Sequence, residues 1–269
     1  MRIVVIAALA AVLAGPPTAA AQGASPRYVE PLTAGMALPA TPLAGEHDAR
    51  TVVANPGGLA LIRGTELALA LDLEDMEVAT TGPGFGAFWA RSIGGRIVPR
   101  LGVGLGLEWL RPARDRLSVD PHEPFRFTLG VAAPLSATAG VGAAWHHLHG
   151  DGALDGVDAV DLGVSARFGS YLAAGATLRD LATSSIAGAP VERRYEAEGV
   201  VRPLGSDVLE AALGGRIGET RGDVDGWVRA SWRVARGVYL HGALESRARR
   251  FLADSAVGSE ERDGRELRA

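Results

Sequence analysis

The stretch Leu101–Trp109 reads LGVGLGLEW and alternates strictly between two kinds of residue. The even positions hold three glycines and Glu108, and a period of two indicates a β-strand whose two faces differ. A strand of a soluble sandwich would turn polar side chains to water, but here that face is mostly empty. The pattern favours a transmembrane barrel strand, with lipid outside and a crowded or wet lumen inside. The odd positions carry the apolar side chains of Leu101, Val103, Leu105, Leu107 and Trp109.

The same alternation recurs along most of the chain. Most of these stretches have the roughly nine to eleven residues that a tilted strand needs to cross a bilayer. Short turns alternate with longer polar connections, the last of them at 247–263, and in bacterial outer-membrane barrels the short turns are periplasmic. The predicted strands span about 66–74, 83–91, 98–110, 124–134, 137–146, 158–168, 171–181, 193–202, 207–217, 224–234 and 237–246.

These features predict an all-β protein, an antiparallel up-and-down transmembrane β-barrel of about 12 strands over residues 65–269. The segment Arg265–Ala269 has the pattern expected at the beginning of the twelfth strand. Outer-membrane barrels usually end in a complete strand with a terminal aromatic residue. We therefore expect the last strand to be incomplete and the barrel to be C-terminally truncated.

The N-terminus has the features of an exported protein. Arg2 precedes an apolar core at 3–14, and Ala19–Ala21 form a small-residue cleavage site before Gln22. Residues 1–21 are therefore predicted to be a cleaved secretory signal peptide, and the mature barrel is expected in the cell outer membrane.

Residues 22–64 are rich in Pro, Ala and Gly, and we predict an irregular segment in the periplasm or inside the barrel mouth. Near its end Asn55–Gly58 reads Asn-Pro-Gly-Gly, which predicts a tight turn leading into the first strand.

Charged residues fall mainly on the glycine-bearing face of the predicted strands. Because an arginine that faces lipid near the bilayer midplane costs about 2–4 kcal/mol, these side chains are predicted to line the lumen. Their mixed signs predict ion pairs across a narrow or plugged barrel. The predicted lumen-lining residues are Glu66, Asp72, Glu108, Arg126, Asp161, Arg167, Arg179, Glu196, Glu198, Glu210, Arg216, Arg229, Arg233 and Glu245.

Outward-facing aromatic residues are expected to form belts where the strands meet the membrane interfaces. Trp109, Phe127 and Trp145 are predicted at the strand ends that precede or follow long loops. The opposite belt, at the short turns, is predicted to contain Trp89, Phe168 and Trp232.

Composition excludes several classes of partner and chemistry. The formal charge of −4 gives no reason to expect nucleic acid as a partner, although every basic residue is arginine. The absence of cysteine excludes disulfides and thiol chemistry. Beyond the signal peptide, no run of about 18 apolar residues could form a membrane-spanning helix.

We predict no catalytic residue, cofactor or metal site in this chain. The tract His146–Asp151 reads HHLHGD and is predicted to lie in an external loop, where a histidine-rich tract can bind metal. Its spacing matches no structural zinc pattern. Ser184 and Ser185 lack a Gly-x-Ser-x-Gly setting. The glycine runs alternate with leucine and open no helix, so they are not phosphate-binding loops.

The segment Asn55–Ala60 resembles the Asn-Pro-Ala-Gly-Leu-Ala signature near the N-terminus of FadL-type and PorV-like outer-membrane proteins, with Gly57 in place of alanine. The resemblance implies a barrel that transports a small hydrophobic ligand or serves as a secretion-associated scaffold. The chain is also similar to the barrel-like N-terminal region that precedes an SppA-type signal peptide peptidase. That resemblance implies a C-terminal protease domain, with its catalytic serine and lysine after Ala269.

Three functional hypotheses follow. The first is an outer-membrane porin, transporter or anchoring scaffold, narrow or plugged, whose partners are outer-membrane lipid and the barrel assembly machinery. The second is the barrel region of a membrane-associated SppA-type protease. The third is a soluble periplasmic β-sandwich that binds a ligand.

Overall fold

Twelve strands dominate the part of the chain that the structure, a computed structural model, describes. They follow two short helical segments, α2 (Thr51–Ala54) and η2 (Pro56–Leu61). The described residues are 33, 35, 36, 38, 41–72, 84–95, 100–110, 125–150, 155–182, 191–219, 224–235, 238–247 and 250–259. The strands are β1 (Thr65–Asp72), β2 (Gly84–Ile93), β3 (Leu101–Leu110), β4 (Phe125–Ser136), β5 (Ala139–His149), β6 (Val157–Phe168), β7 (Leu172–Arg179), β8 (Arg194–Val201), β9 (Leu209–Gly218), β10 (Val224–Ala235), β11 (Val238–Arg247) and β12 (Arg250–Ser259).

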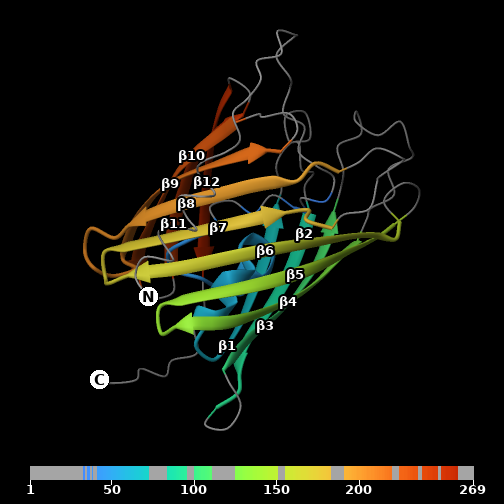
Figure 1. The fold of residues 1–269 in the computed structure, drawn as a ribbon. Helices are drawn as coiled ribbons and strands as arrows, with labels where there is room; N and C mark the ends of the chain where they lie inside the picture. The colour runs from blue at the N-terminus through green and yellow to red at the C-terminus, as the bar shows by residue number, and fades with distance from the viewer. Residues whose placement is uncertain are drawn as a thin grey trace.

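All twelve strands belong to one sheet, in which the spatial order equals the sequence order (Figure 1). Every described pairing is antiparallel; Leu105, for example, pairs with Trp89 on β2 and with Leu129 on β4. The first eleven strands match the predicted ranges to within about three residues. The predicted all-β, up-and-down barrel class is confirmed, and a single sheet of this order is not a two-sheet sandwich.

The prediction for the twelfth strand was wrong. The range 247–263 was predicted to be a polar loop, but β12 lies within it and Arg250 pairs directly with Arg247 of β11. The connection is therefore only residues 248–249. The predicted signal peptide and the segment Arg265–Ala269 lie outside the described residues.

The two faces of the wall separate as the alternation predicts. The outward side chains remain exposed although they are large and apolar: Leu69 is 66% and Leu213 is 68% exposed. Their neighbours of opposite parity point inward, and Ala212 beside Leu213 is 4% exposed. An apolar exterior of this extent is typical of a wall that faces lipid. Within the described residues, neither helical segment has the length and hydropathy of a membrane-spanning helix.

Connections of different length distinguish the two ends of the wall. At the short-turn end, β4–β5 and β10–β11 are joined by residues 137–138 and 236–237. At the long-loop end, β3–β4 and β7–β8 are joined by residues 111–124 and 180–193.

The N-terminal segment fills the inside of this wall. Figure 1 shows α2 and η2, in blue, within the curve of the sheet. We call the described residues between Thr33 and Ile62 the plug. Asn55–Gly58 was predicted to be a turn leading into the sheet; instead it is buried at the centre of the plug, and only Arg63 and Gly64 separate Ile62 from β1. The plug contacts inner faces from β2 to β10, so the sheet wraps around it.

Candidate functional site: the plugged lumen

Wall glycines allow η2 to lie directly against the sheet. A side chain at Gly142 of β5 would overlap the carbonyl group of Pro56, and one at Gly102 of β3 would overlap the carbonyl of Leu59. The inner face of β3 looks empty in the sequence because the plug occupies that volume, with its backbone at Gly102 and with the side chains of Val52 and Leu59 at Gly104. The glycines therefore mark the contact surface of a buried segment.

Asn55 joins the plug to β6 and positions η2. Its Nδ2 donates to the carbonyl of Val164 on β6 at 2.9 Å and to that of Leu43 within the plug at 2.6 Å. Its Oδ1 accepts from the backbone N–H of Gly57 at 3.1 Å, which caps the N-terminus of η2. A fully buried asparagine is thus satisfied at both ends of its amide.

Apolar side chains join the plug to the inner faces of β2, β3 and β4. Val52 and Leu59 of the plug pack in one buried cluster with Phe88 and Ala90 of β2. Phe88, on the inner face of β2, is fully buried. The plug thus shares one buried apolar cluster with the inner faces of β2, β3 and β4.

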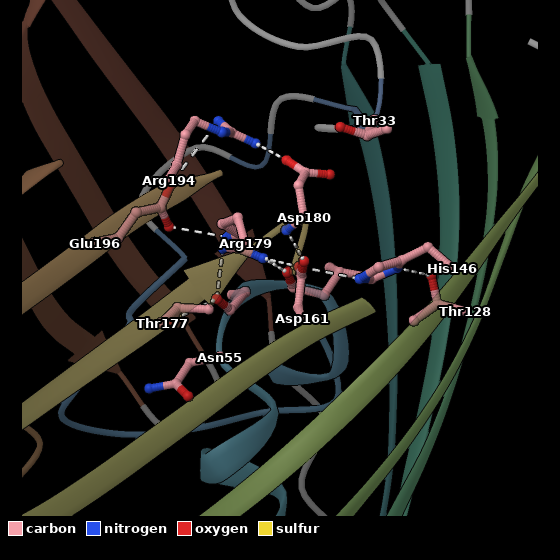
Figure 2. Close-up of polar contacts among 12 residues, drawn as sticks. Thr33, Asn55, Thr128, His146, Asp161, Thr177, Arg179, Asp180, Arg194 and Glu196 are labelled. Atoms are coloured by element: carbon pink, nitrogen blue, oxygen red, sulfur yellow. Dashed lines mark hydrogen bonds and ion pairs between the residues drawn. The ribbon is translucent and has the colours of Figure 1, made fainter. Parts of the chain in front are cut away.

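Arg179 at the end of β7 holds the C-terminus of α2 (Figure 2). It donates to the carbonyls of Val53 at 2.5 Å and Ala54 at 2.6 Å, and the last carbonyls of a helix have no partner within it. The same guanidinium pairs with Asp161 at 2.8 Å and with Glu196 at 3.0 Å. Two wall carboxylates therefore orient one arginine toward the plug backbone.

A chain of polar groups extends from this arginine across β6, β5 and β4 (Figure 2). Asp161 lies 3.0 Å from Nε2 of His146, whose Nδ1 lies 2.9 Å from the hydroxyl of Thr128. Hydroxyl, imidazole and carboxylate stand in the order of a hydrolase triad. However, Thr128 and His146 are 0% and 2% exposed, so no substrate reaches the hydroxyl, and the chain serves to fix Asp161.

A second charged pair binds the plug at Ala44. Glu198 of β8 accepts from the Ala44 N–H at 3.1 Å, and Arg229 of β10 donates to the Ala44 carbonyl at 3.5 Å. Arg229 and Glu198 are themselves 2.9 Å apart. Arg167 of β6 donates to the next carbonyl, that of Gly45, at 3.2 Å.

A third pair repeats this arrangement near the long-loop end. Glu108 of β3 accepts from the N–H of Met36 at 3.1 Å, and Arg126 of β4 donates to the carbonyl of Thr33 at 2.7 Å. The two side chains form an ion pair at 2.5 Å and are almost fully buried. The plug is thus held at three points along its length.

His47 is buried in the plug and is neutral at ordinary pH. Its Nε2 lies 2.6 Å from the hydroxyl of Ser165 on β6. Burial first, and then the positive charge of Arg167, lower the pKa of His47 from 6.5 to about 3. Burial alone would raise the pKa of the neighbouring Asp48, but the guanidinium of Arg50 lowers it below its ordinary value.

The structure places the predicted lumen-lining residues in several groups. The side chains of Asp72 and Glu245 lie outside the described residues. Arg216 pairs with Asp225 at 3.3 Å, and Arg233 pairs with Asp207 at 2.7 Å toward the short-turn end. Glu66 of β1 is partly buried. The residues brought onto the plug or its supporting pairs are Glu108, Arg126, Asp161, Arg167, Arg179, Glu196, Glu198, Glu210 and Arg229.

Several site residues were missed by sequence analysis. Arg202 follows β8 and pairs with Glu210 at 2.7 Å and with Glu46 of the plug at 3.3 Å. Arg194 of β8 pairs with Asp180 at 3.3 Å. Parity could have found Arg194 and Arg202, since both fall on the inward parity of the predicted strand 193–202, whereas Glu46 lies in the segment predicted to be irregular.

The histidine tract is not in a loop as predicted; His146, His147 and His149 belong to β5. Their parity separates them, because His146 points inward to Asp161 while His147 and His149 point outward. His147 stacks on Trp145 with ring centroids 5.6 Å apart and bonds Asp158 at 3.0 Å.

The predicted aromatic residues lie on the outer face of their strands. At the long-loop end Trp109 contacts Phe85 and Phe125, and Phe127 contacts Trp145, with ring centroids 5.1–6.1 Å apart. Trp232 and Phe168 lie toward the short-turn end and are 54% and 47% exposed. Trp89 pairs with Leu67 and Leu105, nearer the middle of the wall.

Fold and lumen together define a plugged, up-and-down β-barrel with an apolar exterior. No family model and no curated protein matches the chain. Among solved structures, KdgM porin is 9% identical, with 74% of this chain and 98% of that chain covered and a TM-score of 0.46. A mutant of the Rh. blastica porin is 14% identical over 74% of each chain, with a TM-score of 0.42. The barrel assignment rests on this chain's own strand order and exposed side chains.

Proposed function

We propose that this protein is an outer-membrane barrel of the porin or transporter type, closed at rest by its N-terminal plug and opened when the plug moves. The observation that carries the proposal is the placement of the described plug residues inside the wall, where charged wall side chains bind them at three points. A segment that precedes β1 can leave the lumen without any strand pairing being broken.

Localisation in the outer membrane is supported by the exposed apolar band and by the predicted signal peptide. Leu67, Leu69 and Leu71 are each at least 65% exposed on one face of β1, and water would solvate such a face poorly. The aromatic contacts of Trp109 and Trp145 at the long-loop end suit a membrane interface.

The lining favours a polar solute over the small hydrophobic ligand that the FadL-type resemblance implies. Described inward side chains from β6 to β10 include the buried charges of Asp161, Glu198 and Arg229, which an apolar ligand would leave desolvated. A PorV-like scaffold role and an SppA-type protease domain after Ala269 remain hypotheses that rest on resemblance alone.

A disulfide between plug and wall tests the proposal, and the chain has no cysteine of its own to interfere. Ala44 belongs to one buried cluster with Ala212 of β9, so Ala44→Cys/Ala212→Cys is the pair chosen to lock the plug, and formation of its disulfide is checked first. In planar bilayers we expect the reduced protein to open and the oxidised protein to stay closed, with at least about a tenfold difference in mean conductance.

The matched control is Ala44→Cys/Ala230→Cys, because Ala230 points outward from β10 and its thiol cannot reach the plug. This variant should conduct equally with and without reductant. Equal conductance of the oxidised and reduced Ala212→Cys pair, once the disulfide is verified by mass, would overturn the gating role of the plug.

A further inference from the structure

Most polar contacts from the wall to the plug are made with the main chain of the plug. Wall side chains contact the backbone at Thr33, Met36, Ala44, Gly45, Val53 and Ala54. The described contacts from the wall to plug side chains are fewer, notably Ser165 with His47 and two arginines with Glu46. Any polypeptide presents the same N–H and C=O groups.

Two of the wall pairs have the chemistry of a peptide-binding unit. In Glu198–Arg229 and in Glu108–Arg126, the carboxylate accepts from a backbone N–H while the guanidinium donates to a backbone carbonyl. Each carboxylate is also bonded to its arginine, so both groups are oriented before a peptide arrives. Charge-assisted bonds of this kind are stronger than neutral ones.

The fit also selects for small residues. A side chain at Gly35 would overlap Arg126, one at Gly45 would overlap Glu210, and one at Gly57 would overlap the backbone of β6. Residues packed against the wall include Ala44, Ala49 and Ala60, all at most 5% exposed. At these positions the lumen therefore accepts a backbone only where that backbone carries glycine or alanine.

We infer that the lumen is a binding site for a separate polypeptide segment rich in glycine and alanine, which takes the position of the plug and is recognised through its main chain. The plug is then an intramolecular occupant of a peptide-binding lumen. This inference deepens the proposed function, on which it rests for the release of the plug, because it names the class of ligand that the opened lumen holds.

The test uses the full chain carrying the single substitution Ala212→Cys, reconstituted in lipid vesicles. The probe is a synthetic peptide of residues 33–61 in which the position of Ala44 is cysteine, activated as a mixed disulfide. If the peptide takes the place of the plug, the thiol of residue 212 attacks the activated disulfide of the peptide, which forms a disulfide between peptide and wall and releases the activating thiol. The full chain with Ala230→Cys is the control for collisional reaction, because that thiol lies on the outer face of β10.

We expect faster adduct formation at residue 212 than at residue 230. We also expect a roughly tenfold slower reaction at residue 212 with a peptide that carries leucine in place of Gly45 and Gly57, because overpacking carries that cost. Equal rates at the two wall positions, or equal rates for the two peptides, would overturn the inference. Failure of the gating proposal is distinct, since it appears in the conductance of the locked and unlocked plug and not in adduct formation.

Discussion

The two sides of the lumen hold the plug by opposite means. From β3 to β6 the wall contributes Gly102, Gly142 and Gly163, which let backbone meet backbone. From β7 to β10 it contributes Arg179, Glu198 and Arg229, whose long charged side chains reach the plug backbone, as those of Glu108 and Arg126 do at the long-loop end of β3 and β4. On the glycine side the wall contacts the plug because its residues lack side chains, and on the charged side it does so through long side chains.

The difference has consequences for what can release the plug. Contacts of the glycine side depend on volume and on excluded water, so they respond little to salt or pH. Contacts of the charged side depend on ion pairs whose strength changes with protonation and screening. We therefore expect the contacts of the charged side to break first when the plug is released, and the contacts of the glycine side to determine the position of the seated plug.

Removal of the Arg179 charge is expected to have the largest effect. In Arg179→Met, Asp161 and Glu196 lose their shared partner and the carbonyls of Val53 and Ala54 lose their donor. Breaking a buried ion pair by removing one partner costs about 3–5 kcal/mol. The loss should appear as a plug released at rest, measured as raised conductance in planar bilayers.

Arg233→Met is the matched control, because Arg233 pairs with Asp207 at 2.7 Å near the short-turn end and has no described contact with the plug. A partly exposed pair of this kind is worth at most about 1 kcal/mol. Equal conductance of the two variants would show that Arg179 does not anchor the plug.

A side chain on the glycine side should have a smaller but still large effect. In Gly142→Val the added side chain would overlap the carbonyl of Pro56. Overpacking of this kind typically costs about 1–3 kcal/mol. We expect a lower Tm of the heat-induced change in gel migration, with little dependence on salt.

Gly199→Val is the control for this prediction, because a side chain at Gly199 of β8 meets open space on the outer face. It should leave Tm almost unchanged. An equal fall in Tm for both variants would mean that valine disturbs the strand itself and not the plug contact.

Alternation could predict the wall because the first eleven strands obey it locally. It placed eleven strands and the inward parity of residues such as Glu108 and Arg126 without any knowledge of their partners. It failed for β12, where Phe251 and Leu252 are adjacent and break the period of two. Parity also applies to His146, but the polar character of its tract favoured a loop over the end of a strand.

The plug could not be predicted, because its contacts are remote in sequence. Gly142 and Pro56 are far apart in the chain, and nothing local to either residue specifies that they touch. The empty face of β3 indicated free volume in the lumen, but volume alone does not identify its occupant. The Asn55–Gly58 signal was interpreted as a turn because Asn-Pro and Gly-Gly are turn formers, whereas here they let a helical segment pack against glycine strands.

Acid is expected to weaken the binding of the plug gradually. Per pH unit, this effect is smaller than those expected for Arg179→Met and Gly142→Val. The seated plug keeps His47 neutral with a pKa of about 3, whereas the released histidine has its ordinary pKa of 6.5. Below pH 6.5 the released state therefore binds a proton that the seated state excludes, so seating is fully favoured above pH 6.5 and weakens as pH falls toward 3. The free energy that favours the seated plug falls by at most about 1.4 kcal/mol per pH unit. The charges facing His47 are those of Asp48 in the plug, Arg167 on β6, Arg202 after β8 and Arg229 on β10, and the arginines keep their charge throughout this range.

The reaction of Ala44→Cys with a bulky maleimide measures this release, because the thiol is fully buried while the plug is seated. Corrected for the pH dependence of the thiol itself with the exposed Ala230→Cys, the rate should rise as pH falls from 7 to 4.5. The further substitution His47→Gln should flatten that rise, since glutamine keeps a polar contact for Ser165 and has no proton to bind. A rise that persists in His47→Gln would assign the acid response to wall carboxylates, and thus to the charged side of the lumen alone.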